Sequence, residues 1–403
     1  ALWLIDNNIF LNTMWTNALV SEIAACAFVQ AGISVSVLLL HVILPGRHVT
    51  GYCCDRNMQP LSYKLNGLLV LLAVGAVFTA SPVTAQVFLY NNYYKCVCGA
   101  NVFGVLLSVM FYIRGGTEKY FRCVTIDQLK DKNKSIPLAS DNVSEVSRFY
   151  LGCEWNPRIY GVDIKMLLYI IGAVGLELNI LSCCSVQFYS SNGYISNGLV
   201  VYAVMFLWFL HEYMLFERVH LYTYDLFAEK LGFKLVWGCT VFYPHFYCIG
   251  MHSLLAASKD NDLPYGACLA VLSLFLVGWC ITRGANLQKY MCRTSPDCKL
   301  VFGGLIEQRT IPGTRILCSG FWGAARHFNY AGEILQGIAL ALPGTFLGYT
   351  LFSKIFPWVY PLFYITLFVT RQHDDDELCK KKYGAKWDEY CAAVPWKILP
   401  GIW

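Results

Sequence analysis

Long apolar runs recur along the whole chain, and short polar loops separate them. About 20 helical residues are needed to cross a ~30 Å hydrocarbon core. Nine runs approach or exceed that length, near 20–44, 65–92, 97–113, 165–187, 198–216, 231–257, 265–282, 330–350 and 355–370. They lack the two-residue alternation of barrel strands. The pattern therefore predicts an all-α polytopic membrane protein, a bundle of roughly eight to ten transmembrane helices.

Composition and charge agree with that class. Hydrophobic residues make up 56% of the chain and charged residues 14%, whereas a soluble domain has about 25% charged residues. Basic residues gather near 114–132, 283–299 and 380–386, and the positive-inside tendency predicts that these regions face the cytosol. The sequence has no Walker loop, no GxGxxG after a strand, no GxSxG and no HExxH. The 18 cysteines show no zinc-type spacing, so no metal site is expected.

Polar residues concentrate in the last third of the chain. Asn286, Lys289 and Arg293 follow the run at 265–282 and are spaced to share one face of a helix. Two interpretations remain open for this stripe. The cations can snorkel to the membrane interface, or the stripe can bind an anion.

A second polar group lies between Trp322 and Glu333. Arg326 can hold a phosphate through two donors, and Trp322 can stack on a planar ring. An interfacial aromatic belt with a snorkelling arginine would account for these two residues. It does not account for Asn329 and Glu333, which enter the next apolar run. Polar groups there usually face a cavity or a ligand, so we favour a binding site.

Three consecutive acids follow the last apolar run, shortly after Arg371. Asp375 can accept hydrogen bonds from ribose hydroxyls or an amide, or it can pair with Arg371. We interpret Asp374 and Asp376 as solvated acids. Beyond them, the stretch 382–390 predicts an amphipathic helix on the membrane surface.

Two further acids lie near the end of the run at 198–216. Glu217 and Asp225 are eight residues apart, close to two helical turns, which would bring them near one face. Burial raises carboxyl pKa values, so such a pair could supply a proton. They could equally be structural acids that pair with Arg218 or His220.

Several motifs together resemble one known family. They are the tail segments 319–333 (SGFWGAARHFNYAGE) and 379–403 (CKKKYGAKWDEYCAAVPWKILPGIW), RGANLQK at 283–289, LPGR at 44–47 with Tyr63, Asn66 and Gly67, Glu154 with NPRI at 156–159 and DIK at 163–165, and Glu217, Thr223 and Asp225 with Gly232. This set resembles the sterol double-bond reductases, which include Δ14-, Δ7- and Δ24(28)-sterol reductases and the membrane half of lamin B receptor. The resemblance covers about residues 40–403.

The resemblance implies a multi-pass enzyme of the endoplasmic reticulum membrane that uses NADPH, with a sterol substrate that enters from membrane lipid and with no nucleic-acid partner. It implies one membrane domain over 1–403, with sterol-side helices in 1–260 and the cofactor region in 261–403. Matching positions to the family gives the NADPH-binding candidates Lys289, Arg293, Trp322, Arg326, Asn329, Tyr330, Arg371, Asp375 and Tyr390.

The reaction implied is stepwise reduction of a carbon–carbon double bond. A general acid protonates one carbon and hydride from the nicotinamide reaches its neighbour. Glu217 and Asp225 are the acid candidates, with Tyr213 and Tyr243 as lesser ones.

The position of the double bond is harder to assign from these residues. Phe328 and the triplet 237–239 resemble Δ7 members, so Δ7 is favoured. The triplet HEY at 211–213 and the stretch 227–233 resemble the Δ14 branch, and Δ24(28) stays open.

Two other classes compete with this assignment. Isoprenylcysteine-type methyltransferases share a similar tail but lack the elements at 283–289 and 156–159. A non-catalytic membrane protein like lamin B receptor is the non-enzyme alternative. A transporter is disfavoured because the polar residues gather at one end of the sequence rather than in two corresponding repeats.

Overall fold

The computed structural model describes residues 17–55, 57–115, 124–126, 144–255 and 257–403. Two compact units divide the chain. The first unit comprises Ala1–Ile195 and Phe206–Cys248, and the second comprises Ser196–Met205 and Ile249–Trp403. Helix α10 (Asn197–Leu215) contributes residues to both units.

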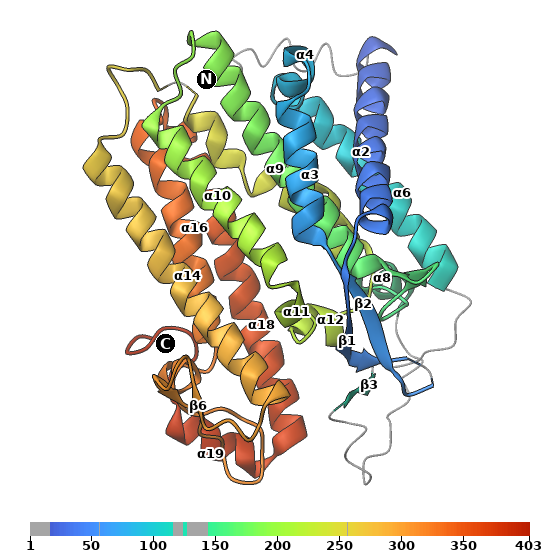
Figure 1. Ribbon diagram of the computed structural model, residues 1–403, viewed down its shortest axis with the longest axis vertical. Coiled ribbons are helices and arrows are strands. Elements are labelled where there is room, and N and C mark those ends of the chain that lie inside the picture. Colours follow the sequence, from blue (N-terminus) through green and yellow to red (C-terminus); the bar gives the residue numbers. More distant parts are fainter. Residues whose placement is uncertain (1–16, 56, 116–123, 127–143, 256) are drawn as a thin grey trace. The chain divides into compact units, whose positions relative to one another are not determined.

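Six helices are long and apolar enough to cross a membrane, which confirms the polytopic helical class (Figure 1). They are Leu19–Ile43 within α2 (Asn17–Ile43), α6 (Tyr93–Gly115), α9 (Ile164–Ser190), α10, α14 (Tyr265–Thr294) and the stretch Leu351–Tyr383 that holds α17 (Leu351–Ile355), η4 (Phe356–Trp358) and α18 (Val359–Tyr383). Six of the nine predicted runs match these helices. The remaining three runs take other forms.

Two of the three differing runs contain a proline where the helix is interrupted or changes form. The run at 65–92 is broken at Ser81-Pro82 into α3 (Gly67–Thr79), α4 (Val83–Gln86) and α5 (Phe88–Asn91), because proline cannot continue the hydrogen-bonded ladder of a preceding helix. The run at 231–257 becomes α13 (Phe233–Trp237), the π-helix η2 (Gly238–Phe246) and the 3₁₀-helix η3 (Ile249–Ser253), with Pro244 inside the π-helix. The run at 330–350 is one helix of 20 residues, α16 (Phe328–Leu347), with polar side chains in its first half.

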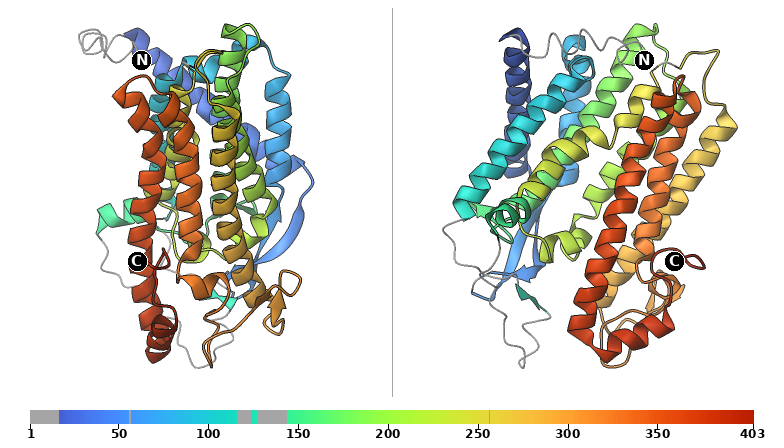
Figure 2. Two further views of the ribbon diagram at one scale, coloured as in Figure 1. Left: turned by 90° about the vertical axis from the view of Figure 1, so that its left-hand side faces the viewer. Right: turned by 180° about the vertical axis from the view of Figure 1, so that it is seen from behind.

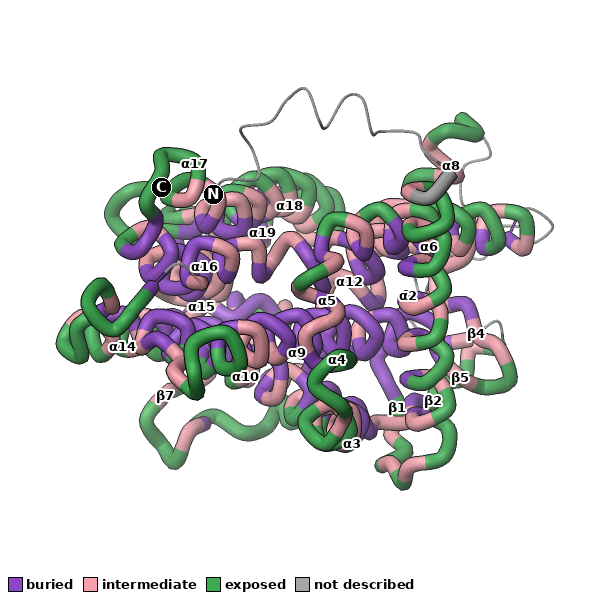
Figure 3. The backbone as a smooth tube through the Cα atoms, turned by 90° about the horizontal axis from the view of Figure 1, so that it is seen from above, coloured by how far each residue is buried: buried purple, intermediate pink, exposed green. Residues whose placement is uncertain are grey.

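Helix α9 is the buried centre of the first unit, as its purple backbone in Figure 3 shows. It packs against η2 and α3. Glycines allow the close approach to η2: a Cβ atom on Gly175 would lie 2.7 Å from the Cβ of Pro244, and one on Gly172 would lie 2.7 Å from the Cys239 carbonyl oxygen. The family-like segments next to this helix fold into short elements, namely α8 (Glu145–Leu151), β4 (Arg158–Ile159), β5 (Val162–Asp163), α11 (Glu217–His220) and α12 (Tyr224–Phe227).

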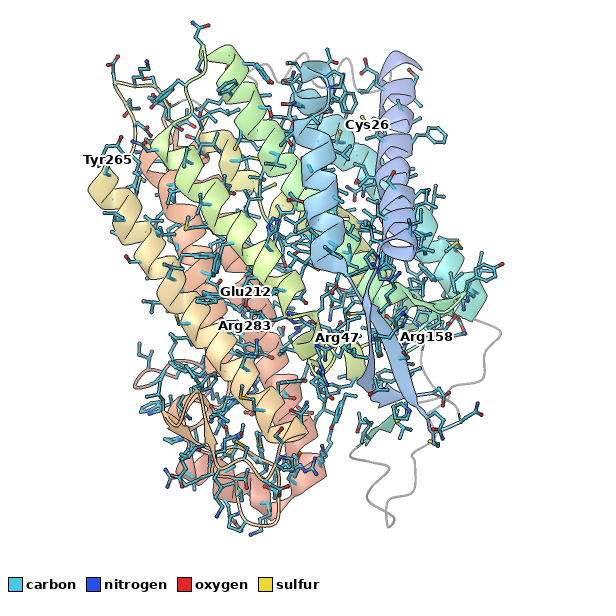
Figure 4. The ribbon with its side chains drawn as sticks, in the orientation of Figure 1. Cys26, Arg47, Arg158, Glu212, Tyr265 and Arg283 are labelled. Atoms are coloured by element: carbon cyan, nitrogen blue, oxygen red, sulfur yellow. The ribbon has the colours of Figure 1, made fainter. Side chains whose placement is uncertain are left out.

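A hairpin that the hydrophobic pattern did not predict joins these segments. Strand β1 (Arg47–Cys54) pairs antiparallel with β2 (Pro60–Leu65) and with β3 (Val124–Thr125). The guanidinium of Arg158 donates to the Ser62 carbonyl at 2.6 Å, lies 4.7 Å from the Tyr63 ring centroid, and is 3.5 Å from the Asp163 carboxylate. The elements at 44–67 and 154–165 therefore hold each other in place (Figure 4 labels Arg47 and Arg158).

Lys165 has a structural role in the same unit. Its side chain is fully buried, and its ammonium donates to the carbonyl oxygens of Asp225, Leu226 and Glu229 at 2.9–3.1 Å. Carbonyl groups at a helix end lack partners within the helix and favour a nearby cation. Lys165 thus fixes α12 and the residues after it to the start of α9.

The second unit is built on α14, α16 and α18, which lie side by side in both views of Figure 2. A Cβ atom on Gly332 of α16 would lie 2.5 Å from the Gly278 carbonyl oxygen of α14, so only glycine allows this contact. The smaller elements of the unit are β6 (Leu300–Val301), β7 (Ile306–Glu307), α15 (Phe321–Ala324) and α19 (Ala385–Ala393).

The C-terminal helix packs on protein. Trp387 and Tyr390 of α19 are buried in a cluster with Ile311, Ile316 and Val394. The prediction of an amphipathic helix on the membrane surface over 382–390 is therefore wrong for its apolar face. Gly384 (φ 55°) ends α18 and turns the chain, which lets the helix fold back onto the loop at 311–316.

Candidate functional site

All nine candidate cofactor residues lie in the second unit. Helix α14 carries Lys289 and Arg293, the α15–α16 junction carries Trp322, Arg326, Asn329 and Tyr330, α18 carries Arg371 and Asp375, and α19 carries Tyr390. Figure 4 labels Arg283, which starts the polar end of α14. The sequence expectation that these segments meet is consistent with the packing of α14 and α18 against α16.

Trp322 is held by three neighbours. Its indole N–H donates to the Ala285 carbonyl at 2.8 Å, and its own carbonyl accepts from the Tyr390 hydroxyl at 3.1 Å. The ammonium of Lys289 lies 4.7 Å from the ring centroid, within cation–π range. Burial raises the pKa of Tyr390, so its phenol stays protonated and donates. Tyr390 therefore positions Trp322 and Lys289 rather than presenting its own hydroxyl.

Arg326 and His327 face two acids of α18. The Arg326 guanidinium is 7% exposed and lies 3.5 Å from the Asp376 carboxylate. The imidazole of His327 lies 3.9 Å from Asp375 through Nδ1 and 3.7 Å from Asp376 through Nε2. Gln372 is fully buried and donates to Asp376 at 2.5 Å.

The interpretation of Asp376 as a solvated acid is therefore wrong, whereas Asp374 is exposed as expected. Asp376, His327 and Gln372 are not among the site residues predicted from the sequence; for Gln372 and Asp376 the reason is that the hydrophobic pattern predicts a helix end near 370. In fact α18 continues to Tyr383. A helix through this region places Gln372 and Asp376 one turn apart, and that spacing is the signal that could have found them.

A column of parallel rings fills the space beside these ions. The Tyr330 ring stacks on His327 with centroids 5.2 Å apart and on Phe368 with centroids 4.4 Å apart. Phe368 stacks in turn on Tyr364 at 4.8 Å. The column joins α16 to α18 and fixes the imidazole opposite the two carboxylates.

Asn329 of α16 contacts α14 through two hydrogen bonds. Its side-chain nitrogen donates to the Asn286 side-chain oxygen at 3.4 Å, and its backbone carbonyl accepts from the Thr282 hydroxyl at 3.1 Å. Several buried side-chain atoms in this region have no hydrogen-bond partner among the residues that the structure describes: Arg326 Nε, Asn329 Oδ1, Gln336 Oε1 and Gln372 Oε1. Unsatisfied buried polar groups are rare in native proteins and are typical of a binding site.

The backbone of this site is completed by the tail of the chain. The N–H groups of Arg326 and His327 donate to the carbonyls of Trp396 and Lys397 at 2.9 and 2.8 Å. The motifs at 319–333 and 379–403 are therefore hydrogen-bonded to each other. Among the described residues, no group of three or more His, Cys, Asp or Glu side chains could hold a metal ion.

The two acid candidates lie in the first unit. Both carboxylate oxygens of Glu217 lie 3.1 Å from the Gly67 backbone nitrogen, and the side chain is buried. Burial raises the pKa of Glu217 to about 7, although the hydrogen bond from Gly67 opposes that shift. The carboxyl is thus poised near neutral pH, where a general acid works best.

Asp225 is half-buried, and its backbone carbonyl accepts from Lys165. The expectation that Glu217 and Asp225 share a helical face is wrong, because α11 ends at His220 and α12 begins at Tyr224. The lesser candidates differ in setting. The ring of Tyr213 stacks on His220 with centroids 3.6 Å apart, and Tyr243 is buried in η2 beside Tyr247.

Comparison with known proteins covers nearly the whole chain. The model of the family described as "Ergosterol biosynthesis ERG4/ERG24 family" matches residues 5–403. The chain is similar to Delta(14)-sterol reductase of Arabidopsis thaliana, with 28% identity over 368 residues, which cover 90% of this chain and 91% of the relative.

Two further relatives are also named Delta(14)-sterol reductases. Delta(14)-sterol reductase of Methylotuvimicrobium alcaliphilum is 29% identical over 90% of this chain and 80% of its own length. Delta(14)-sterol reductase erg24 of Schizosaccharomyces pombe is 29% identical over 91% of this chain and 82% of its own length.

Proposed function

The chain belongs to the ergosterol biosynthesis ERG4/ERG24 family, and we propose that it reduces the Δ14 double bond of a sterol with NADPH. The observation that carries the proposal is similarity to Δ14-sterol reductases along about nine-tenths of the chain. The family assignment and the reductase class agree with the resemblance seen in the sequence. The Δ7 preference is not confirmed, and Δ7 stays the second candidate because of Phe328 and the triplet 237–239.

The polar cluster of the second unit fits NADPH as a ligand. Lys289, Arg293, Arg326 and Arg371 offer cationic donors for phosphate groups. Asn329 and Gln336 each hold a buried oxygen without a hydrogen-bond partner in the described part of the chain. Asp375, on the same helix as Arg371, can accept from ribose hydroxyls. When bound, NADPH supplies the hydride that reduces the sterol.

The chain's own residues then bind and orient. Trp322, fixed by Ala285 and Tyr390, offers a rigid aromatic surface to a planar ring. Asp376, which accepts a hydrogen bond from Gln372, lies 3.5 Å from the Arg326 guanidinium and can hold it in place as a phosphate donor. Tyr330 is packed among rings, so it contributes its hydroxyl edge rather than an open ring face.

Glu217 is the acid that we favour for the proton that the reduced bond takes up. Its buried carboxyl has a pKa near 7 and so carries a proton in part of the molecules at neutral pH. Asp225, Tyr213 and Tyr243 are weaker candidates. The multi-pass helices place this chemistry in a membrane, and we propose the endoplasmic reticulum membrane as its location.

The first test is turnover by purified protein in lipid nanodiscs with NADPH, a Δ8,14-sterol and 7-dehydrocholesterol, with products identified by mass spectrometry. We expect saturation of the Δ14 bond. Arg326→Ala should weaken NADPH binding by about 10–100-fold, since a hydrogen bond to a charged group contributes about 1.5–3 kcal/mol. Arg309→Ala, at a side chain that is 68% exposed, is the matched control.

The outcomes separate the alternatives. Reduction of 7-dehydrocholesterol alone would favour the Δ7 assignment. Turnover of neither sterol and no measurable NADPH binding would overturn the proposal and leave the non-catalytic alternative.

A further inference from the structure

A single acid lies in the middle of the buried helix α9. Glu177 is 3% exposed and is 13 residues from Ile164, the first residue of a 27-residue span. An ionisable group inside a membrane-spanning helix is costly and usually serves a function. Glu177 is neither one of the proposed proton donors, Glu217 and Asp225, nor one of the candidate cofactor residues.

Lys165, Asn179 and Ser182, three other buried polar residues of α9, each make at least one side-chain hydrogen bond, although Asn179 Oδ1 has no partner among the described residues. Asn179 donates to the carbonyls of Gly175 and Pro244 at 2.9 and 3.0 Å, and Ser182 accepts from the Tyr90 N–H at 3.1 Å. Glu177 differs. Its Oε2 atom is buried and has no hydrogen-bond partner in the ranges that the structure describes. Its Oε1 atom lies 3.6 Å from His211 Nε2 of α10, which is longer than a normal hydrogen bond of about 2.7–3.2 Å.

The Nδ1 atom of His211 has a clear hydrogen-bond role. His211 Nδ1 lies 2.7 Å from the Leu207 carbonyl oxygen. A carbonyl only accepts, so Nδ1 carries a proton. Nε2 faces the Glu177 carboxyl, where it accepts a hydrogen bond when the ring is neutral and donates one when the ring is protonated. The pair therefore offers carboxyl oxygens as acceptors to a third group, and a donor whenever a proton is on Nε2 or on the carboxyl.

A glycine lies next to the carboxyl. Helix α3 faces it with Gly75, where a Cβ atom would lie 3.2 Å from Glu177 Oε1. Gly75 thus lets the backbone of α3 lie close to Oε1 without a side chain that covers the carboxyl. The His211 side chain is 29% exposed, so the pair is reachable from one side.

We propose that Glu177 and His211 bind the 3-hydroxyl group of the sterol substrate, an inference that rests on the proposed function. A sterol is hydrocarbon apart from that hydroxyl, which both donates and accepts. It would donate to Glu177 Oε2, which has no partner among the described residues, and accept from a proton on His211 Nε2. The pair is thus a polar end point for a ligand that is otherwise held by apolar contacts.

The test compares a sterol with its 3-deoxy analogue, which lacks only the hydroxyl. Binding of each is measured by displacement of a radiolabelled sterol from wild type, Glu177→Leu and Glu22→Leu proteins in nanodiscs. Wild type and Glu22→Leu, a control at an exposed glutamate, should bind the hydroxylated sterol at least about tenfold more tightly, since a lost partner leaves buried polar groups unpaired. Glu177→Leu should bind both sterols with similar affinity.

His211→Leu is the second variant, in case the first does not fold, and it should lose the same preference. Equal binding of both sterols by wild type, or a preference that survives in both variants, would overturn the inference and leave a structural pair. Because binding is read without turnover, failure of this inference is distinct from failure of the proposed reduction. A protein that binds the sterol through this pair but reduces nothing would overturn only the proposed function.

Discussion

At the scale of single residues, a buried carboxyl connects stability with pH. Glu217 accepts the Gly67 N–H, which belongs to the first residue of α3. The group keeps its proton to a higher pH in the folded protein than in the unfolded chain, because burial raises its pKa from 4.5 to about 7. The folded state therefore binds more protons between these two values. The contribution of the Glu217 carboxyl to the free energy of unfolding is therefore greatest below pH 4.5 and is lost as the pH rises through 7.

Glu217→Gln should remove this dependence. From pH 5 to pH 8 the free energy of unfolding of the wild-type protein should fall by up to about 3 kcal/mol more than that of the variant, because each pKa unit corresponds to about 1.4 kcal/mol. The measurement is the apparent thermal unfolding midpoint in nanodiscs at both pH values. Glu22→Gln, at an exposed site, should behave as wild type. Equal pH dependence of Glu217→Gln and wild type would contradict the raised pKa.

A buried lysine gives a second prediction at this scale. Lys165→Met should lower the free energy of unfolding by about 3 kcal/mol or more, because three carbonyl groups lose a buried cationic donor. Lys234→Met, where the side chain is 36% exposed, should cost less than about 1 kcal/mol. Thermal unfolding of the two variants side by side measures the difference. Equal losses would show that the carbonyls find other partners.

At the scale of elements, close contact between two helices positions the polar cluster. Gly278 on α14 and Gly332 on α16 bring the backbones together. Lys289 and Asn329 lie further along the same two helices. The separation of α14 and α16 thus sets the distance between groups proposed to bind one cofactor. Small residues have this role generally in membrane-helix packing.

Gly332→Ala should therefore destabilise the protein by more than about 1 kcal/mol and weaken NADPH binding, because overpacking forces the helices apart. Gly266→Ala, in α14 with open space around it, should be neutral or stabilising by up to about 1 kcal/mol, since alanine is the better helix former. Unfolding midpoints and NADPH titration distinguish the two. A neutral Gly332→Ala would mean that the contact relaxes without cost.

Hydropathy predicted the elements well where a helix is uninterrupted and poorly where it is not. The run at 165–187 matches α9 closely, because its apolar residues extend without Pro. The hydropathy of the run at 231–257 predicts one span; Pro244 is present in its sequence, but the π-helical backbone around it is seen only in the structure. The hairpin β1–β2 was missed because its strands are partly polar and its partners lie at 124–125 and 158, far along the chain.

The candidate site was predictable as a set of segments but not as a set of contacts. Motif spacing placed Arg326 and Asp375 in the site, yet Asp376 is the acid 3.5 Å from Arg326. The choice between neighbouring aspartates depends on the rotation of α18 about its axis. That rotation is set by stacked rings such as Phe368 on Tyr330, which no local pattern encodes.

At the scale of the molecule, the charge distribution makes a prediction about orientation. Cys298 is exposed in the loop after α14, beside the basic residues Arg293 and Lys299. The positive-inside tendency places this loop in the cytosol. Membrane-impermeant maleimide should label Cys298 in sealed microsomes whose cytosolic face points outward, as read by peptide mass spectrometry. Labelling that appears only after permeabilisation would reverse the orientation.

The hydrogen bonds from Arg326 and His327 to Trp396 and Lys397 impose an order on biosynthesis. The acceptors are translated roughly 70 residues after the donors, which at ribosomal speeds of about 5–20 residues per second is about 4–14 s. During that interval the backbone N–H groups of Arg326 and His327 lack their final partners. Nascent chains therefore pass through a window in which this segment is open to chaperones and degradation machinery, and variants in 394–399 are expected to reduce cellular abundance before they affect catalysis.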